Sequence, residues 1–189
     1  MYTKIIISII IFVSALNVRA QDFQPYPVKS GLLEYKFEGR TQGTEIFYFD
    51  DYGKLLSIKK TTVLLSDENT IEETVLSIYR NDTLFEVNMR NNTVFIYDTD
   101  NQTIKSKLIS IGMLQTLGYD ELGNENIAGI NCVKYSGKNG NLWVWNNIVL
   151  KSEMEIMDIS ISSEAVMFLT DIVIPPSKFE IPKNYKIIN

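Results

Sequence analysis

The side chains of this sequence that could carry out chemistry are almost all carboxylates. The chain has 23 aspartates and glutamates, one cysteine and no histidine. Without histidine there is no Ser-His or Cys-His nucleophile pair, no histidine-ligated zinc and none of the commonest general acid or base near neutral pH. Catalysis by carboxylates alone, as in glycosidases, remains open. A carboxylate-dependent hydrolase is therefore one candidate function.

Neighbouring carboxylates occur at two places in the sequence. Asp50 and Asp51 stand in a turn, and Glu72 and Glu73 open an expected strand. Adjacent side chains of a strand point to opposite faces, so these pairs are poor acid and base partners as they stand. Only carboxylates that converge in the fold could act together, and we expect no enzyme.

Asp98 and Asp100, in the stretch DTDNQ, are the nearest match to a calcium loop. The stretch lacks the glycine and the distal glutamate that an EF-hand requires. A strand-joining turn explains it without an ion. We therefore expect no metal and no cofactor.

Cys132 is the only cysteine, so no internal disulfide can form. Its neighbours Ile130 and Val133 are aliphatic, and no base or cation adjoins it in the sequence. A reactive thiol needs such a neighbour. The pattern predicts a small buried hydrophobic side chain.

Residues 1–20 have the parts of a secretory signal peptide. Lys4 precedes an apolar run over 5–13, and Ala20 ends a small-residue cleavage site. The run is shorter than the roughly 20 residues that cross a bilayer. No cysteine follows it, so a lipidated N-terminus has no attachment point. We expect a single domain over 21–189, periplasmic or secreted, with no membrane span after cleavage.

The charge of the chain argues against nucleic acid as a partner. The net charge is −5, and it falls to −7 when the segment that carries Lys4 and Arg19 is removed. Nucleic acid and anionic membranes attract basic surfaces. We therefore expect neither as a partner.

The elements that position these residues are mostly strands. In GLLEYKFEG, residues 31–39, Leu33, Tyr35 and Phe37 alternate with charged residues, which is the period of a half-buried strand. Similar segments follow, separated by turns rich in Asn, Asp and Gly: TEIFYFD, KLLSIKKTTVLL, ETVLSIYR, TLFEVNMR, TVFIYD, GINCVKYSG and NLWVWN. The order predicts an antiparallel meander.

One segment departs from this period. In KLISIGMLQTLGYDELG, residues 107–123, Leu108, Ile111, Leu114 and Leu117 recur at helical spacing, and Gly118 is suited to end a helix. We expect this helix to cover part of the sheet. The last fifteen residues contain too many prolines for an interior strand and should run along the surface, anchored by Phe179, Ile181 and Tyr185.

The late strands are apolar on both faces. In NLWVWN, Trp143 and Trp145 alternate with Leu142 and Val144. In EAVMFLTDIVI, residues 164–174, both sides are again aliphatic or aromatic. A sheet with one face in water would show polar residues at every second position, so we expect both faces of these strands to be covered.

Three segments together resemble the periplasmic lipoprotein carriers of the LolA type and their relatives in gram-negative bacteria. They are YPVKSGLLEYKFEGRTQGTEIFYFDDYGK, LGYDELGNENIAGINCVKYSGKNGNLWVWNNIVLKSE and DIVIPPSKFEIPKNYKI. The last resembles the family's closing motif, with Asn184 where the family has glycine; asparagine also tolerates positive φ. The resemblance implies a mainly β (α+β) fold, a curved antiparallel sheet or incomplete β-barrel with a short helix on its concave side.

The resemblance further implies an exported, non-enzymatic binding protein that holds a lipid, an acyl chain or another apolar ligand in the concavity. The expected apolar lining consists of Trp143, Trp145, Met154, Met157, Met167 and Phe168. The same side chains would equally fit a core packed against the helix. The alternative function is a cell-envelope protein-interaction module of the same fold, whose cavity is filled by its own side chains.

Overall fold

A computed structural model describes residues 24–39, 42–65, 70–80, 82–98 and 107–188. The expected signal peptide, residues 1–20, lies outside them, as does Asp100. Within the described residues, no helix is both long and apolar enough to cross a membrane.

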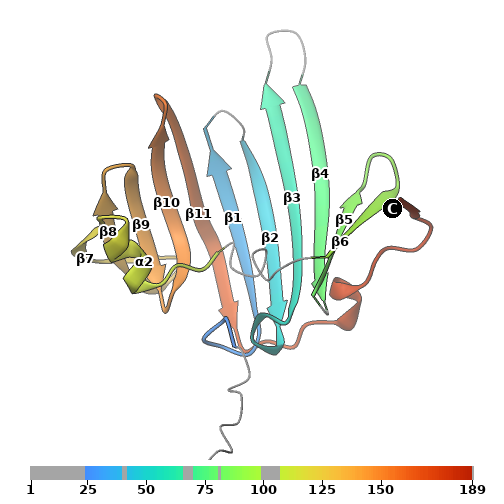
Figure 1. Ribbon diagram of the computed structural model, residues 1–189, viewed down its shortest axis with the longest axis horizontal. Helices are drawn as coiled ribbons and strands as arrows, with labels where there is room; N and C mark the ends of the chain where they lie inside the picture. Colours follow the sequence, from blue (N-terminus) through green and yellow to red (C-terminus); the bar gives the residue numbers. More distant parts are fainter. Residues whose placement is uncertain (1–23, 40–41, 66–69, 81, 99–106, 189) are drawn as a thin grey trace, which may run out of the picture.

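The first half of the chain forms six consecutive strands, β1 to β6, each paired antiparallel with the next (Figure 1). Their bounds are Gly31–Glu38, Gln42–Asp50, Leu55–Leu65, Thr70–Arg80, Thr83–Asn88 and Thr93–Asp98. A short 3-10 helix, η1 (Asp51–Gly53), joins β2 to β3 at the turn that the sequence predicts. The period-two segments of the sequence are thus a continuous meander.

The second half forms a second antiparallel meander. Its strands, β7 to β11, are Asp120–Ile127, Ile130–Gly137, Gly140–Trp145, Ile148–Ile156 and Ile159–Thr170. The last of them, β11, pairs antiparallel with β1, with Leu33 opposite Phe168. This pairing joins the two meanders into one sheet, whose far edge is the C-terminal strand β12 (Lys186–Ile188). The strand order is β12-β6-β5-β4-β3-β2-β1-β11-β10-β9-β8-β7.

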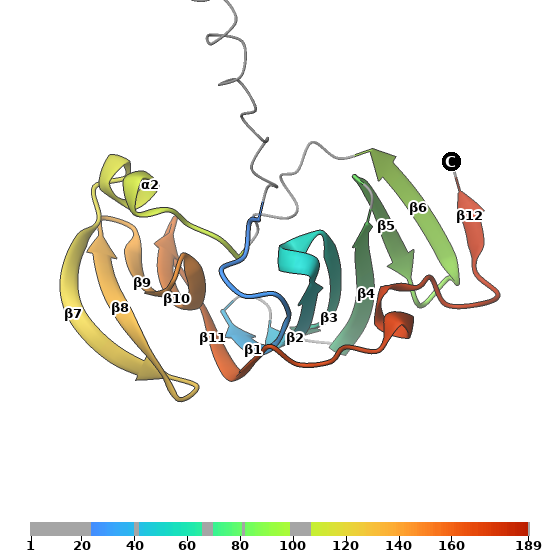
Figure 2. The same ribbon diagram turned by 90° about the horizontal axis from the view of Figure 1, so that it is seen from below.

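The sheet is strongly curved and open, and its two edges rise on either side of a concave inner face (Figure 2). Near the N-terminus, the chain lies on this inner face, where the ring of Tyr26 stacks on Phe49 with centroids 4.5 Å apart. Phe47 lies next to both rings and is fully buried. Gly53 has φ +93°, and a Cβ there would collide with the Tyr26 ring. The lower half of the concavity is therefore a packed core.

The predicted helix is shorter than its apolar pattern. Helix α2 spans Ile111–Thr116, with Ser110 as its N-cap, and the chain leaves it through Gly118 at φ +73°. Leu114 is buried and packs in a cluster with Tyr135, Leu142 and Val144. Ile111 and Leu117 are more than half exposed. Helix α2 thus covers the part of the sheet near β8 and β9 with essentially one side chain.

The C-terminal segment runs along the lower ends of β1 to β4 and then joins the far edge of the sheet (Figure 2). It contains the 3-10 helix η3 (Pro176–Phe179) and strand β12 (Lys186–Ile188), which pairs parallel with β6. Phe179 is buried, and Asn184 has φ +72°, as the sequence predicts. The surface path of this segment is confirmed.

The predicted fold class is confirmed: the chain is mostly β, with one curved, open, twelve-stranded sheet and one short helix. The expectation that both faces of 164–174 are covered is wrong for the outer face. Val166, Met167, Leu169 and Val173 are 39 to 96% exposed. Alternation in the sequence shows that two apolar faces exist, but it does not show that something packs on each.

We expect Phe47→Ala to lower the free energy of unfolding by about 3–5 kcal/mol, because it removes a fully buried ring between Tyr26 and Phe49. Urea denaturation followed by circular dichroism measures the loss. Val173→Ala, at a side chain that is 96% exposed, is the control and should change stability by less than about 0.5 kcal/mol. Equal losses for both variants would contradict this account of the core.

Candidate functional site

A cavity of about 230 Å³ opens on the inner face above the packed core. We call it the inner cavity. Its lining comes from both halves of the chain: Tyr35, Phe37, Glu45, Lys60, Lys107, Ile161, Ser162 and Ser163. The lining therefore combines apolar side chains with three charged ones.

Sheet register places most of these residues side by side. Glu45 lies directly opposite Tyr35 on β1 and opposite Lys60 on β3, so the three share the inner face. Phe37 lies opposite Gly43, where a Cβ would reach to 2.6 Å from the Phe37 ring. Glycine at this position lets the ring lie over the β2 backbone.

Lys107 enters the cavity from the segment that links the two meanders. Its Nζ is 2.7 Å from Oε1 of Glu45 and 4.4 Å from the centroid of the Tyr35 ring. The two charged side chains are only 20% and 11% exposed. The contact is a short ion pair, and apart from Lys107 no described group bonds to Oε1 of Glu45, which is buried.

The neighbours of this ion pair are held in place by hydrogen bonds. The Tyr35 hydroxyl donates to the carbonyl oxygen of Val149 at 2.8 Å. The amide of Val149 in turn donates to the carbonyl oxygen of Lys107 at 2.9 Å. Burial raises the pKa of Tyr35 well above its usual value, so the phenol stays a neutral donor.

A second hollow of about 520 Å³ follows the rim of the sheet at the upper ends of β1, β9, β10 and β11. This rim groove shares Ile161 and Ser162 with the inner cavity. It also contains Met154, whose sulfur accepts a hydrogen bond from Tyr119 at 3.7 Å. The two hollows therefore meet the same short stretch of β11, where Ile161 is 43% exposed. The rim groove also contains the carboxylates of Glu38, Glu153 and Glu155.

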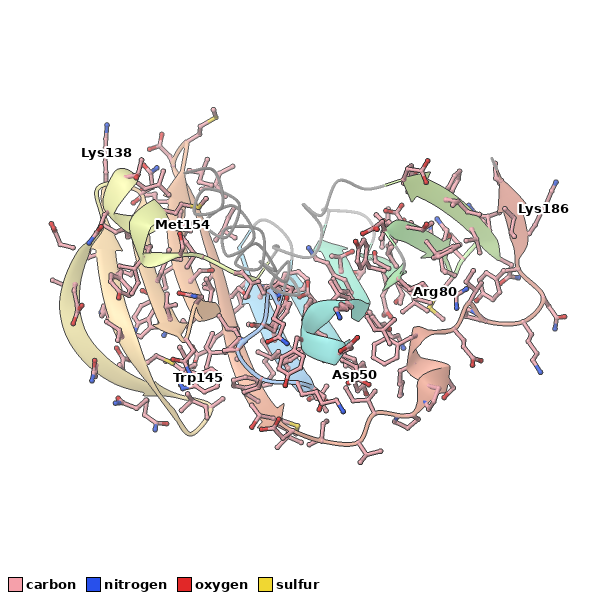
Figure 3. The ribbon with its side chains drawn as sticks, turned by 60° about the horizontal axis from the view of Figure 1, so that its bottom comes forward. Asp50, Arg80, Lys138, Trp145, Met154 and Lys186 are labelled. Carbon is pink, nitrogen blue, oxygen red and sulfur yellow. The ribbon has the colours of Figure 1, made fainter. Side chains whose placement is uncertain are left out.

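Among the six lining residues predicted from the sequence, Met154 lines the rim groove, while Trp145 and Phe168 meet elsewhere. Their rings contact edge to face with centroids 5.3 Å apart, and Phe168 is 7% exposed. Figure 3 shows Trp145 at the opposite end of this half of the sheet from Met154. The structure thus places this aromatic pair in the packed core.

Trp143 is 2% exposed, and charged side chains surround it. Its indole nitrogen donates to Oε2 of Glu125 at 2.7 Å. The ammonium groups of Lys134 and Lys151 lie 4.6 and 4.8 Å from its ring. Burial opposes the charge of Lys151, but hydrogen bonds to Glu164 and Glu153 outweigh it and raise its pKa.

The last two predicted lining residues lie away from both hollows. Met157 is 91% exposed in the turn between β10 and β11, and Met167 is 39% exposed on the outer face of β11. Sequence reasoning missed Glu45, Lys60 and Lys107, which lie in the inner cavity. The alternation of β1 and β2 could have suggested Glu45, because it falls on the apolar side of its strand.

The remaining candidate groups for chemistry are carboxylates and Cys132. No group of three or more Cys, Asp or Glu side chains among them is placed to hold a metal ion. Cys132 is fully buried, and its pKa is raised to about 11, mainly by burial. Asp50 caps η1 by accepting a hydrogen bond from the amide of Asp51 at 2.7 Å.

No protein-family model and no curated protein sequence matches the chain. Solved structures do match its fold. An uncharacterised conserved protein from Thermus thermophilus superposes with a TM-score of 0.56 and 10% identity, over 86% of this chain and 91% of that one. MucB superposes with a TM-score of 0.52 and 11% identity, over 87% of this chain. The chain has a LolA-like and MucB-like fold. It spans 61% of the length of MucB.

We expect the Cys132 thiol to be almost inert in the folded protein. With a pKa of about 11, its thiolate fraction at pH 8 is on the order of 0.1%, whereas an unfolded cysteine of ordinary pKa is partly ionised there. Labelling with a disulfide reagent should be at least about a hundredfold slower in buffer than in guanidinium chloride. Equally fast labelling in both conditions would contradict the burial of Cys132.

We expect Lys107→Met to lower the free energy of unfolding by about 1–3 kcal/mol, because it leaves the Glu45 carboxylate buried without its cation. The double variant Glu45→Gln/Lys107→Met should recover much of this loss, since replacing both partners of a buried pair is often nearly neutral. Denaturation of the wild type, both single variants and the double variant measures the coupling. Strictly additive losses would show that the two charges do not interact.

Proposed function

We propose that this chain is an exported, non-enzymatic binding protein that holds the apolar part of a lipid or another apolar ligand on the concave face of its sheet. The inner cavity and the adjoining rim groove are the proposed site. Export is proposed from the pattern of residues 1–20. The curved, open sheet of the LolA-like fold supplies the concave face on which such a ligand would lie.

The observation that carries the proposal is the contrast between the two ends of the concavity. At the lower end, Tyr26 fills the inner face and is 1% exposed. At the upper end, Tyr35, Phe37 and Ile161 line a cavity, and Ile161 is 43% exposed on the inner face. An exposed aliphatic side chain inside a concavity is a contact surface for an apolar ligand.

The dimensions suit a slender ligand. The rim groove, at about 520 Å³, lies within the roughly 300–1,000 Å³ of typical small-molecule sites. The inner cavity is smaller and would take one end of such a molecule. Binding would come from buried apolar area, at about 25 cal/mol per Å², less the cost of ordering the ligand.

We expect Ile161→Glu to weaken binding of a fluorescent fatty-acid analogue by at least about tenfold, because a carboxylate would replace the apolar contact at the junction of the two hollows. Leu169→Glu is the matched control. Leu169 lies on the same strand, is 45% exposed and faces the opposite side of the sheet. Fluorescence titration of both variants compares the two faces.

The alternative, an envelope protein-interaction module, is favoured by a different observation. Val166, Met167, Leu169 and Val173 expose apolar surface on and just after β11, outside the concavity. In that case the fatty-acid analogue would not bind, or both variants would bind it equally. A partner captured from envelope extracts would then be lost with Leu169→Glu and kept with Ile161→Glu.

A further inference from the structure

We propose that the inner cavity recognises an anionic headgroup, so that the ligand is an anionic amphiphile and the cavity holds its polar end. This inference rests on the proposed function and names the class of ligand. The groups that would bind the anion are Lys60 and Lys107, with Glu45 and Tyr35 holding Lys107 in position.

Lys107 is a fixed cation. The backbone around it is tied to the other half of the sheet, because the amide of Val149 donates to the Lys107 carbonyl and the amide of Ile109 donates to the Asn147 carbonyl. Its ammonium group lies between Glu45 and the face of the Tyr35 ring. A cation held in this way needs little ordering when a ligand binds.

Lys107 also has hydrogen-bonding capacity to spare. An ammonium group has three donors, and here it makes one ion-pair contact and one ring contact. These two contacts use at most two of the three donors. The side chain of Lys107 lines the cavity, so a ligand oxygen there could accept its free donors.

Lys60 supplies a second cation. It lies across the strand pair from Glu45, and its Nζ is 4.8 Å from the centroid of the Phe37 ring. Among the described residues, no carboxylate forms an ion pair with it. The cavity therefore has two lysines and one glutamate, an excess of one positive charge in a chain whose net charge is −5.

The apolar side chains around these charges indicate an amphiphile. Phe37 and Ile161 line the same cavity, and Ile161 also borders the rim groove. Ser163, which lies opposite Phe37, adds a hydroxyl group that can donate to an anion. A carboxylate or phosphate head between the lysines, with its chain directed past Ile161, would satisfy both kinds of lining.

The test compares ligands that share one dodecyl chain and differ in the head. Dodecanoate and dodecyl phosphate are anionic, dodecyl glycerol ether is neutral, and dodecyltrimethylammonium is cationic. Calorimetric titration of the mature protein, below the micelle concentrations, measures each affinity, and inorganic phosphate is titrated separately. We expect the anionic heads to bind about tenfold more tightly than the neutral head, since each tenfold corresponds to one modest charge-assisted contact.

Lys60→Met should reduce this preference to nearly one, and Lys59→Met is its matched control. Lys59 directly precedes Lys60 on β3 and is also exposed. It lies opposite Ile46 on the outer face. The double variant Glu45→Gln/Lys107→Met should also lose the preference, and circular dichroism checks that it is folded. Loss with Lys59→Met as large as with Lys60→Met would overturn the inference.

The remaining outcomes separate this inference from the proposed function. Equal binding of all heads, or preference for the cationic head, would overturn the anionic site and leave apolar binding standing. If inorganic phosphate binds as tightly as dodecyl phosphate, the ligand of the cavity is a small anion, and the proposal of an amphiphile is wrong. No binding of any dodecyl ligand would overturn both proposals.

Discussion

The pairing of β1 with β11 is the constraint on which the rest of the molecule depends. It brings together strands from opposite ends of the chain and converts two antiparallel meanders into one sheet. Without it, each meander would have one more unpaired edge and a smaller inner face. The irregularity between Glu34 and Tyr35 matters as well, because one extra residue on β11 changes which side chains face inward. Ile161 and Phe168 therefore share the inner face although their spacing is odd.

The segment before α2 makes a second link between the two halves of the sheet, besides the pairing of β1 with β11. Leu108 bridges to Ile148, and the backbone of Lys107 and Ile109 bonds to the strand β10 and the turn before it. The side chain of Lys107 then reaches the opposite meander at Glu45. The backbone of Lys107 is bonded to one half of the sheet and its ammonium group is paired with Glu45 in the other half. The ion pair can therefore form only when the two halves are joined.

The sequence predicts the strands well because their burial follows a period of two, as in β1, where Leu33 and Tyr35 are buried and Lys36 is exposed. It predicts two apolar faces around Trp143 but not their cover. That cover is protein: α2 lies over Leu142 and Val144, while Lys134, Lys151 and Glu125 enclose the indole. Lysine stems shield apolar surface while their charges stay near water, so a polar neighbour in the sequence can be part of a buried site. The Lys107 contact joins residues that are far apart in sequence, which no local period records.

Polar side chains also determine where the core ends and the cavity begins on the inner face. Below Glu45, aromatic rings pack on one another, as Tyr26, Phe47 and Phe49 do. At the level of Glu45, a carboxylate and an ammonium group replace apolar partners, and charged groups at this depth resist complete desolvation. Further side chains cannot close over them without leaving charges unsolvated and poorly bonded. The Lys107–Glu45 pair in an apolar concavity thus keeps the space above it open. The additional positive charge of Lys60 makes the lining of that space net positive.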